Sequence, residues 1–200
     1  VYIYFSELTK NQWISSLAAI QFFSIWGIYS ALSFDYHDNV LAAMFVPWFL
    51  FFFNKQKLSY TLLFFILIII CKENMALWMA FICSGLLVSN LKNKNKAILS
   101  ASLMLFAFVY FILVVKVLIP SIANEDREYL HFHYSALGDN FSDAIKTVLT
   151  KPVYVFKVLF INHIDDPMGD GVKAELHYMV LLSGGLALLF KPQYLVMLIP

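Results

Sequence analysis

Charged residues are scarce in this 200-residue chain. They make up 14% of it, whereas hydrophobic residues make up 61% and aromatic residues 18%. A soluble domain is usually about 25% charged and about 45–50% apolar. The formal net charge is only +1, and nucleic-acid binding normally requires a clustered basic face. The composition therefore predicts a multi-pass membrane protein and argues against a nucleic-acid partner.

Cysteine is also nearly absent. Cys71 and Cys83 both lie within apolar runs, so neither a disulfide framework nor a Cys/His metal pattern is indicated. No signal peptide is visible, and residues 1–5 have the character of a helix already under way. The sequence therefore suggests a piece of a longer protein, and it contains no internal repeat.

Long apolar runs predict an all-α fold, a polytopic membrane helical bundle. A bilayer core of about 30 Å needs about 20 helical residues, which residues 12–34 and 97–119 supply. Three intervening runs have only 14 residues each, or roughly 21 Å of helix, so a helix end can lie below the membrane surface. These shorter runs cover residues 40–53, 58–71 and 75–88, and a last apolar run covers 176–190.

The joints between these runs alternate in charge. Residues 54–57 and 90–96 contain lysines and no acid, as cytoplasmic loops do, whereas "FDYHDN" and "CKEN" contain acids and fall on the outer side. One continuous helix over 58–88 is the alternative. That helix would place Lys72 and Glu73 at its middle, at about 2.5–3.5 kcal/mol each, so a turn at 72–74 is favoured.

A polar segment follows residue 119, and it predicts an outer loop over 120–175 within a single membrane domain. Apolar residues recur there at spacings of three and four, from Phe141 to Leu159. This pattern is typical of a helix that lies in the membrane interface, broken or bent at Pro152. A soluble-type amphipathic helix packed on the loop is the alternative.

The order of several motifs resembles a known family. "FDYHDNVLAAMFVPWFLFF", "CKENMALW", "IPSIANEDREYLHFHYSALGDN", "LTKP" and "LLFKPQYLVMLIP" together resemble an uncharacterised bacterial membrane family, domain of unknown function 2079. The match covers nearly the whole chain. The sequence departs from the family pattern at Asp38, Asn39, Asn74 and residues 135–136. The resemblance therefore implies no role for positions 38, 39 and 74.

The resemblance implies a branch of the multi-pass GT-C glycosyltransferases, which use lipid-phosphate sugars at the outer face of the membrane. It implies a protein of the bacterial plasma (inner) membrane that contacts membrane lipid and a polyprenyl-phosphate sugar donor. The first outer loop, which usually supplies the central acidic residue in that class, is expected upstream of Val1. As a cofactor, a divalent metal is left open.

Sugar transfer from such a donor requires a carboxylate to accept a proton and donors or cations to hold the departing phosphate. Ionisable groups at membrane depth are candidates for these roles. Asp38 has the simpler interpretation of a helix cap, and a metal site at His131 and His133 has too few ligands. The candidate catalytic residues are Asp35 and Glu73, and the candidate substrate-binding residues are His37, Lys72, His133 and Tyr134.

Two other functions fit the composition. A transporter or flippase would use intramembrane charges as a substrate or proton path, and a noncatalytic membrane scaffold would use them structurally. Transporters often contain internal repeats and helices broken at corresponding positions. Neither feature is evident here, which favours the enzyme.

Overall fold

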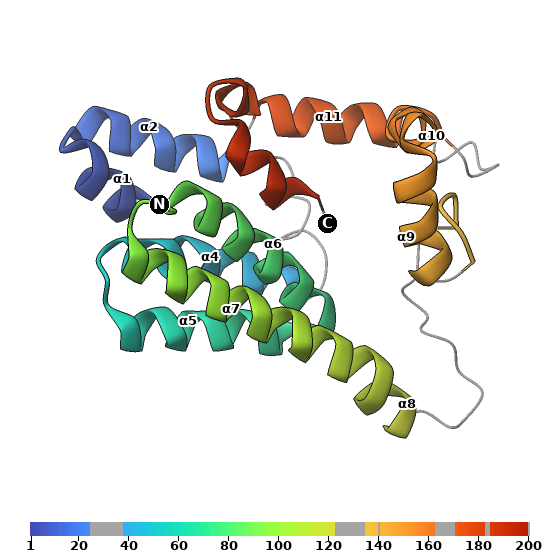
Figure 1. Ribbon diagram of the computed structural model, residues 1–200. Coiled ribbons are helices and arrows are strands. Elements are labelled where there is room, and N and C mark those ends of the chain that lie inside the picture. Colours follow the sequence, from blue (N-terminus) through green and yellow to red (C-terminus); the bar gives the residue numbers. More distant parts are fainter. Residues whose placement is uncertain (25–37, 123–134, 140, 163–170, 183–184, 200) are drawn as a thin grey trace. The chain divides into compact units, whose positions relative to one another are not determined.

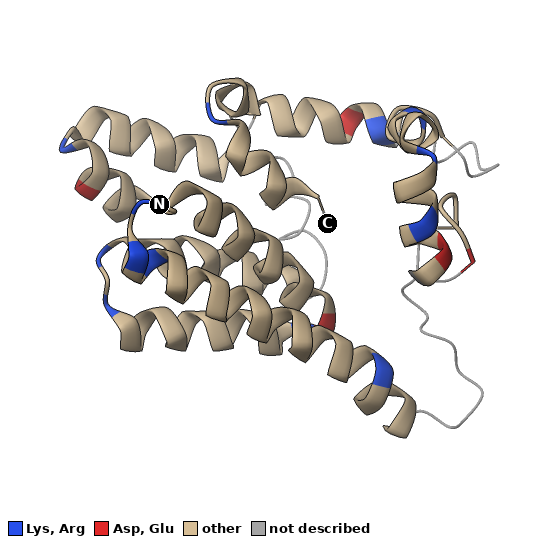
Figure 2. Ribbon diagram, in the orientation of Figure 1, with Lys and Arg blue, Asp and Glu red and all other residues tan. Residues whose placement is uncertain are grey.

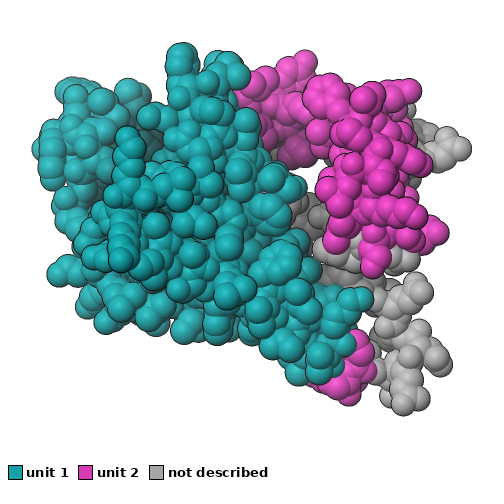
Figure 3. Space-filling model, viewed as in Figure 1, with its two compact units in different colours: residues 1–119, 183–200 teal, residues 120–182 magenta. Residues whose placement is uncertain are grey.

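The structure is a computed structural model that describes residues 1–24, 38–122, 135–139, 141–162, 171–182 and 185–199. All regular elements in these ranges are helical (Figure 1), in agreement with the all-α prediction. The chain forms two compact units, which Figure 3 colours separately. Unit 1 contains residues 1–119 and 183–200, and unit 2 contains residues 120–182.

Four consecutive helices form the centre of unit 1. They are α4 (Asp38–Asn54), α5 (Leu58–Cys71), α6 (Glu73–Ser89) and α7 (Lys94–Leu113). Each packs against the next, and the joints between them are too short for anything but antiparallel neighbours. The α4–α5 and α6–α7 joints consequently lie at one end, and the α5–α6 joint lies at the other with the start of α4 (Figure 1).

The core of these helices is made of large apolar side chains and small residues. Phe49, Phe65 and Met79 are almost completely buried, and Ala76 and Ala107 are fully buried. Small residues allow close approach between helices, as at the interfaces of membrane helices. The backbones of α6 and α7 can therefore pack closely.

The outer surfaces of the same helices are also apolar. In α5, which contains no charged residue, Leu63, Ile66 and Ile70 are about half exposed. Leu105 and Phe106 are similarly exposed on α7. A helix that is hydrophobic on all sides normally has protein or lipid around its whole circumference.

The joint between α5 and α6 consists of one residue in extended conformation. Lys72 has φ −158° and ψ 151°, which interrupts the helix, so the continuous helix considered as the alternative does not form. The helix α6 begins at Glu73, two residues before the expected start, and α4 begins at Asp38 instead of Val40. Both have 17 residues.

The helix α7 continues through a π-helical turn, η1 (Val114–Leu118), into α8 (Ile119–Ile122). The combined segment Lys94–Ile122 has 29 residues and a mean hydropathy of 2.7. Within the described ranges it is the one helix that is long and apolar enough to cross a membrane by length and composition.

Two further parts pack on these four helices. The helices α1 (Tyr2–Thr9) and α2 (Gln12–Phe23) form a hairpin. Lys10 turns the chain with φ 54°, and Asn11 caps α2 by accepting hydrogen bonds from two backbone amides. The 3-10 helix η4 (Pro192–Leu198) packs on α6, where a Cβ on Gly85 would lie 2.6 Å from Met197.

Unit 2 contains the helices α9 (Phe141–Thr150), α10 (Pro152–Val158) and α11 (Val172–Leu182). The chain breaks at Lys151, directly before Pro152 at the first position of α10, because proline fits a first helical turn but not a helix interior. The ammonium of Lys173 donates hydrogen bonds to the carbonyls of Val158 and Ile161, which joins the start of α11 to the end of α10.

The last apolar run has a different form from the expected helix over residues 176–190. The helix α11 ends at Leu182, and the 3-10 helix η3 (Gly185–Leu189) follows further along the chain. The 3-10 helix begins at Gly185, and glycine is about 1 kcal/mol less favourable than alanine in an α-helix interior. Hydropathy alone does not include this cost, so it predicted one helix over the whole run. The apolar run is therefore not one continuous α-helix.

Candidate functional site

The candidate site in unit 1 is the helix end formed by Asp38, Asn39, Lys72, Glu73 and Asn74, called here the Glu73 end. The antiparallel order of α4, α5 and α6 places these five residues at the same end of the unit. Both predicted site residues among them, Lys72 and Glu73, are half-buried. The Glu73 carboxylate lies in the first turn of α6, where the helix dipole favours a negative charge.

Two amide oxygens at the Glu73 end are buried and have no hydrogen-bond partner in the part of the chain that the structure describes. The side-chain oxygens of Asn39 and Asn74 accept no hydrogen bond from any described residue. A buried polar group that lacks a hydrogen bond costs about 1–3 kcal/mol, so such groups are candidates for contact with a ligand, an ion or water. These two asparagines were not predicted as site residues from the sequence, because both depart from the pattern of the family that the sequence resembles.

Asp38 is the first residue of α4 and is exposed, close to the capping position that the sequence predicted. The candidates Asp35, His37, His133 and Tyr134 lie outside the described residues, as does His131. Their assignments remain predictions. Among the described residues, no three His, Cys, Asp or Glu side chains gather closely enough to hold a metal ion.

The opposite end of unit 1 carries lysines. It is called the lysine end and contains one acid, Glu7, among the lysines at 10, 55, 57, 92, 94 and 96. Glu7 accepts from Lys55 at 2.9 Å and from Lys10 at 3.2 Å, and the Lys96 ammonium lies 3.4 Å from the Asn54 side-chain oxygen. Figure 2 shows several basic residues gathered at the joints of this end. The two lysine-rich joints thus share one end of the unit.

Those two ion pairs have an electrostatic consequence for Glu7. The hydrogen bonds from Lys55 and Lys10 lower the pKa of its carboxyl below the ordinary value of 4.5. Glu7 therefore keeps its negative charge among the lysines at neutral pH. The interaction also joins the end of α1 to the joint after α4.

Unit 2 contains a mixed polar and apolar pocket of about 730 Å³. Residues 135–138 form one wall, directly after the predicted substrate-binding residues His133 and Tyr134. The opposite wall carries Lys151, Lys157 and Thr147, a set that can bind an anion through charge and hydrogen bonds. Tyr154 supports the pocket by donating a hydrogen bond from its hydroxyl to the carbonyl of Ala136 at 2.9 Å.

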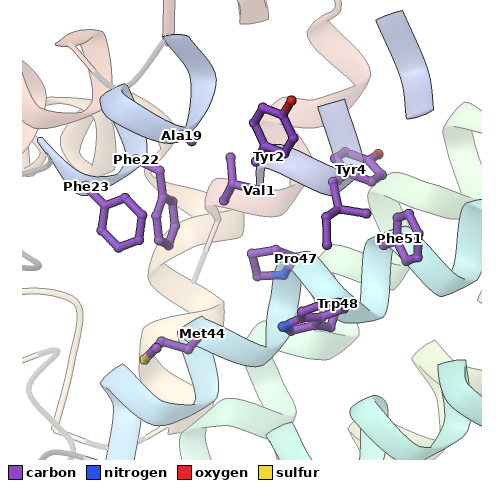
Figure 4. Close-up of a pocket in the computed structure, with 11 residues that line it drawn as sticks. Val1, Tyr2, Tyr4, Ala19, Phe22, Phe23, Met44, Pro47, Trp48 and Phe51 are labelled. Atoms are coloured by element: carbon purple, nitrogen blue, oxygen red, sulfur yellow. The ribbon is translucent and has the colours of Figure 1, made fainter. Parts of the chain in front are cut away.

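An apolar cavity of about 310 Å³ lies between the α1–α2 hairpin and α4. Figure 4 shows Phe22 and Phe23 of α2 and Met44, Pro47 and Trp48 of α4 around this space. No charged side chain lines it. Its chemistry fits contact with hydrocarbon rather than a reaction.

The described residues define the class of this protein, which is all-helical, with an apolar outer surface on its central helices and with charges at the helix ends. The chain belongs to the family of predicted membrane proteins called DUF2079, whose model matches residues 1–200. This confirms the membrane class and the family that the sequence predicted. No curated protein and no solved structure matches the chain.

Proposed function

We propose that the chain is part of a multi-pass, GT-C-like membrane glycosyltransferase of the bacterial plasma membrane. The enzyme transfers a sugar from a polyprenyl-phosphate donor to an envelope acceptor at the outer face. The Glu73 end is the reaction site, and the lysine end faces the cytoplasm. The proposal rests on one observation: partly buried charges and unpartnered amide oxygens gather at one end of helices whose sides are apolar.

The apolar sides support several membrane crossings. The helix α5 exposes large apolar side chains along its length, and α4 and α6 each expose two, Met44 and Trp48 on α4 and Trp78 and Val88 on α6. Each of the three helices has only 14 to 17 residues. Such a surface is unfavourable in water, at about 25 cal/mol per Å² of apolar area. In a bilayer the same surface contacts hydrocarbon and carries no such cost.

Helix length supports a recessed position for the Glu73 end. The 14 residues of α5 extend about 21 Å, compared with a bilayer core of about 30 Å. With the lysine end at the inner surface, the end of α5 lies about 9 Å below the outer surface. A polyprenyl tail stays in the membrane, so its phosphate meets the protein at this depth.

The chemistry assigns one task to each group. The Glu73 carboxylate accepts the proton of the acceptor hydroxyl, and the Lys72 ammonium balances the charge of the phosphate that leaves. The Asn39 and Asn74 amides orient the sugar hydroxyls. Neighbouring residues on a helix do not face each other, so the two charged groups can serve different parts of the substrate.

The remaining predicted residues take supporting parts in this proposal. Asp35, three residues before Asp38, is a second candidate for proton transfer or metal binding, and His37 is a candidate for phosphate binding. His133 and Tyr134 precede the wall of the unit 2 pocket, and we assign them to substrate binding there. The helices α9 and α10 are proposed to lie in the outer membrane interface.

The test measures transfer of a radiolabelled sugar from polyprenyl phosphate by the full-length protein in lipid vesicles. Removal of a general base typically lowers the rate by about 10²–10⁴-fold, so Glu73→Gln and Asp35→Asn are expected to lose at least about 100-fold. Asp38→Asn changes an exposed carboxylate in the first turn of α4 that has no task in the proposed reaction. It is therefore the matched control and is expected to keep its activity.

Each variant is first checked for normal expression and a single size-exclusion peak. Wild-type transfer by both Glu73→Gln and Asp35→Asn would remove these residues from catalysis. Failure of the wild-type protein to transfer any polyprenyl-linked sugar, with transport of the lipid or solute across the vesicle, would favour the transporter.

A further inference from the structure

A groove at the lysine end carries a feature that the proposed reaction does not use. It lies between the α4–α5 joint and the first turns of α7 and has a volume of about 390 Å³. The residues that matter are Gln56, Asn95 and Lys96 at its polar part and Leu58, Ile98 and Leu99 at its apolar part. It is called here the Lys96 groove.

The polar part presents a cation without a carboxylate partner. Lys96 is half-buried, and its ammonium lies 3.4 Å from the Asn54 side-chain oxygen and 5.8 Å from the centroid of the Phe53 ring. Among the described residues the one nearby acid, Glu7, pairs with Lys10 and Lys55 instead. The positive charge of Lys96 is therefore not neutralised within the described part of the protein.

The surrounding charge strengthens the attraction for an anion. Among the described residues, six lysines gather at this end with one acid, Glu7, and Figure 2 shows basic residues at the α1–α2 turn and at the α4–α5 and α6–α7 joints. Lysines at a membrane surface each contribute about 1 kcal/mol to the binding of anionic lipid. A negatively charged group thus binds here in preference to a neutral one.

The apolar part continues away from the charge. Leu58 begins α5 and is 54% exposed, and Ile98 in the second turn of α7 is 55% exposed. Their exposed surfaces lead onto the apolar sides of the same two helices. A free phosphate ion makes no favourable contact with such an apolar surface. A phospholipid does, because its acyl chains lie close to its phosphate and can cover the surface.

We propose that the Lys96 groove binds an anionic phospholipid of the surrounding membrane. The phosphate contacts the Lys96 ammonium and the amides of Gln56 and Asn95, and one acyl chain covers Leu58 and Ile98. The site lies at the end of unit 1 opposite Glu73, so it is separate from the proposed reaction site. Its occupant is a structural lipid and not the sugar donor.

The experiment uses native mass spectrometry of the full-length protein in detergent, titrated with phosphatidylglycerol or phosphatidylcholine. The wild-type protein is expected to bind one phosphatidylglycerol in preference to phosphatidylcholine. Lys96→Gln is expected to weaken that binding about fivefold, the effect of one lysine, and Lys96→Arg is expected to restore it. All variants must first give the wild-type size-exclusion profile.

The matched control is Lys92→Gln, which removes the same charge from the same joint. Lys92 is exposed and does not line the groove, so its replacement removes only a solvent-screened attraction and is expected to weaken the binding clearly less than Lys96→Gln does. Equal losses in Lys96→Gln and Lys92→Gln would overturn the proposal in favour of diffuse attraction. Equal binding of both lipids by the wild-type protein, or full competition by inorganic phosphate, would also overturn it.

The outcome is independent of catalysis. Sugar transfer by Lys96→Gln in vesicles is expected to stay within twofold of wild type when Glu73 is intact. If Lys96→Gln loses lipid binding but keeps sugar transfer, the proposed function is unaffected. If Glu73→Gln loses sugar transfer but keeps lipid binding, the proposed lipid site is unaffected.

Discussion

Replacement of Ile66 by lysine tests whether the outer surface of α5 faces lipid. Ile66 lies near the middle of this uncharged helix, and its side chain is 48% exposed. A lysine at the centre of a spanning helix costs about 2.5–3.5 kcal/mol on insertion scales. Because 1.4 kcal/mol is a factor of ten, insertion falls roughly 60- to 300-fold. At a water-exposed helix position the same change stays within about 0.5 kcal/mol.

The assay follows the inserted fraction of the protein in microsomes through a glycosylation acceptor site in a long polar loop that is added at the one-residue joint after α5. Leu91→Lys is the control, because Leu91 is 67% exposed and lies among the lysines of the α6–α7 joint. It is expected to insert as the wild type does. Equal insertion of Ile66→Lys and Leu91→Lys would refute the inference that α5 contacts lipid.

Three further substitutions test the core, the lysine end and unit 2. Phe49→Ala removes a fully buried ring, so the lost transfer free energy and the cavity left behind together cost about 3–5 kcal/mol; unchanged unfolding by denaturant in detergent would contradict the core position. Glu7→Gln is expected to lower the thermal stability slightly at pH 7. Since the carboxyl pKa is lowered in the folded protein, its stabilisation is fully present above the ordinary value of 4.5 and is lost as the pH falls through the lowered pKa. The difference from wild type should therefore shrink below pH 4.5, and a constant difference down to about pH 3 would contradict the ion pairs. Gly138→Ala adds a Cβ 2.6 Å from that of Asp143 and is expected to make unit 2 more sensitive to protease than it is in the wild-type protein; unchanged sensitivity would contradict this packing.

Much of the helix order could be predicted from the sequence, because each joint between apolar runs carries its own polar signal. The lysines at 55 and 57 and the charged pair at 72–73 fall where α4, α5 and α6 end or begin. Helix ends were less predictable. The sequence predicted that Glu73 lies in a turn. A carboxylate is favourable in the first turn of a helix, and α6 in fact begins at Glu73.

Features that depend on packing between distant segments could not be predicted. The Lys96 groove exists because the α4–α5 joint packs beside the start of α7, about 40 residues later, and Asn54 meets Lys96 there. The unpartnered oxygens of Asn39 and Asn74 likewise depend on what surrounds each side chain. Hydropathy and spacing describe one segment at a time, so they carry no information on either feature.

In the proposed orientation the Glu73 end of unit 1 faces outward and the lysine end faces the cytoplasm, and cysteine labelling measures this orientation. In a protein whose native cysteines are replaced by alanine, single cysteines are placed at Asp38 and Lys57, which are both exposed and lie at opposite helix ends. A membrane-impermeant maleimide is applied to right-side-out vesicles. We expect Asp38→Cys to react in intact vesicles and Lys57→Cys to react only after permeabilisation. Reaction of both cysteines from the same side, or of Lys57→Cys alone from the outside, would contradict the account.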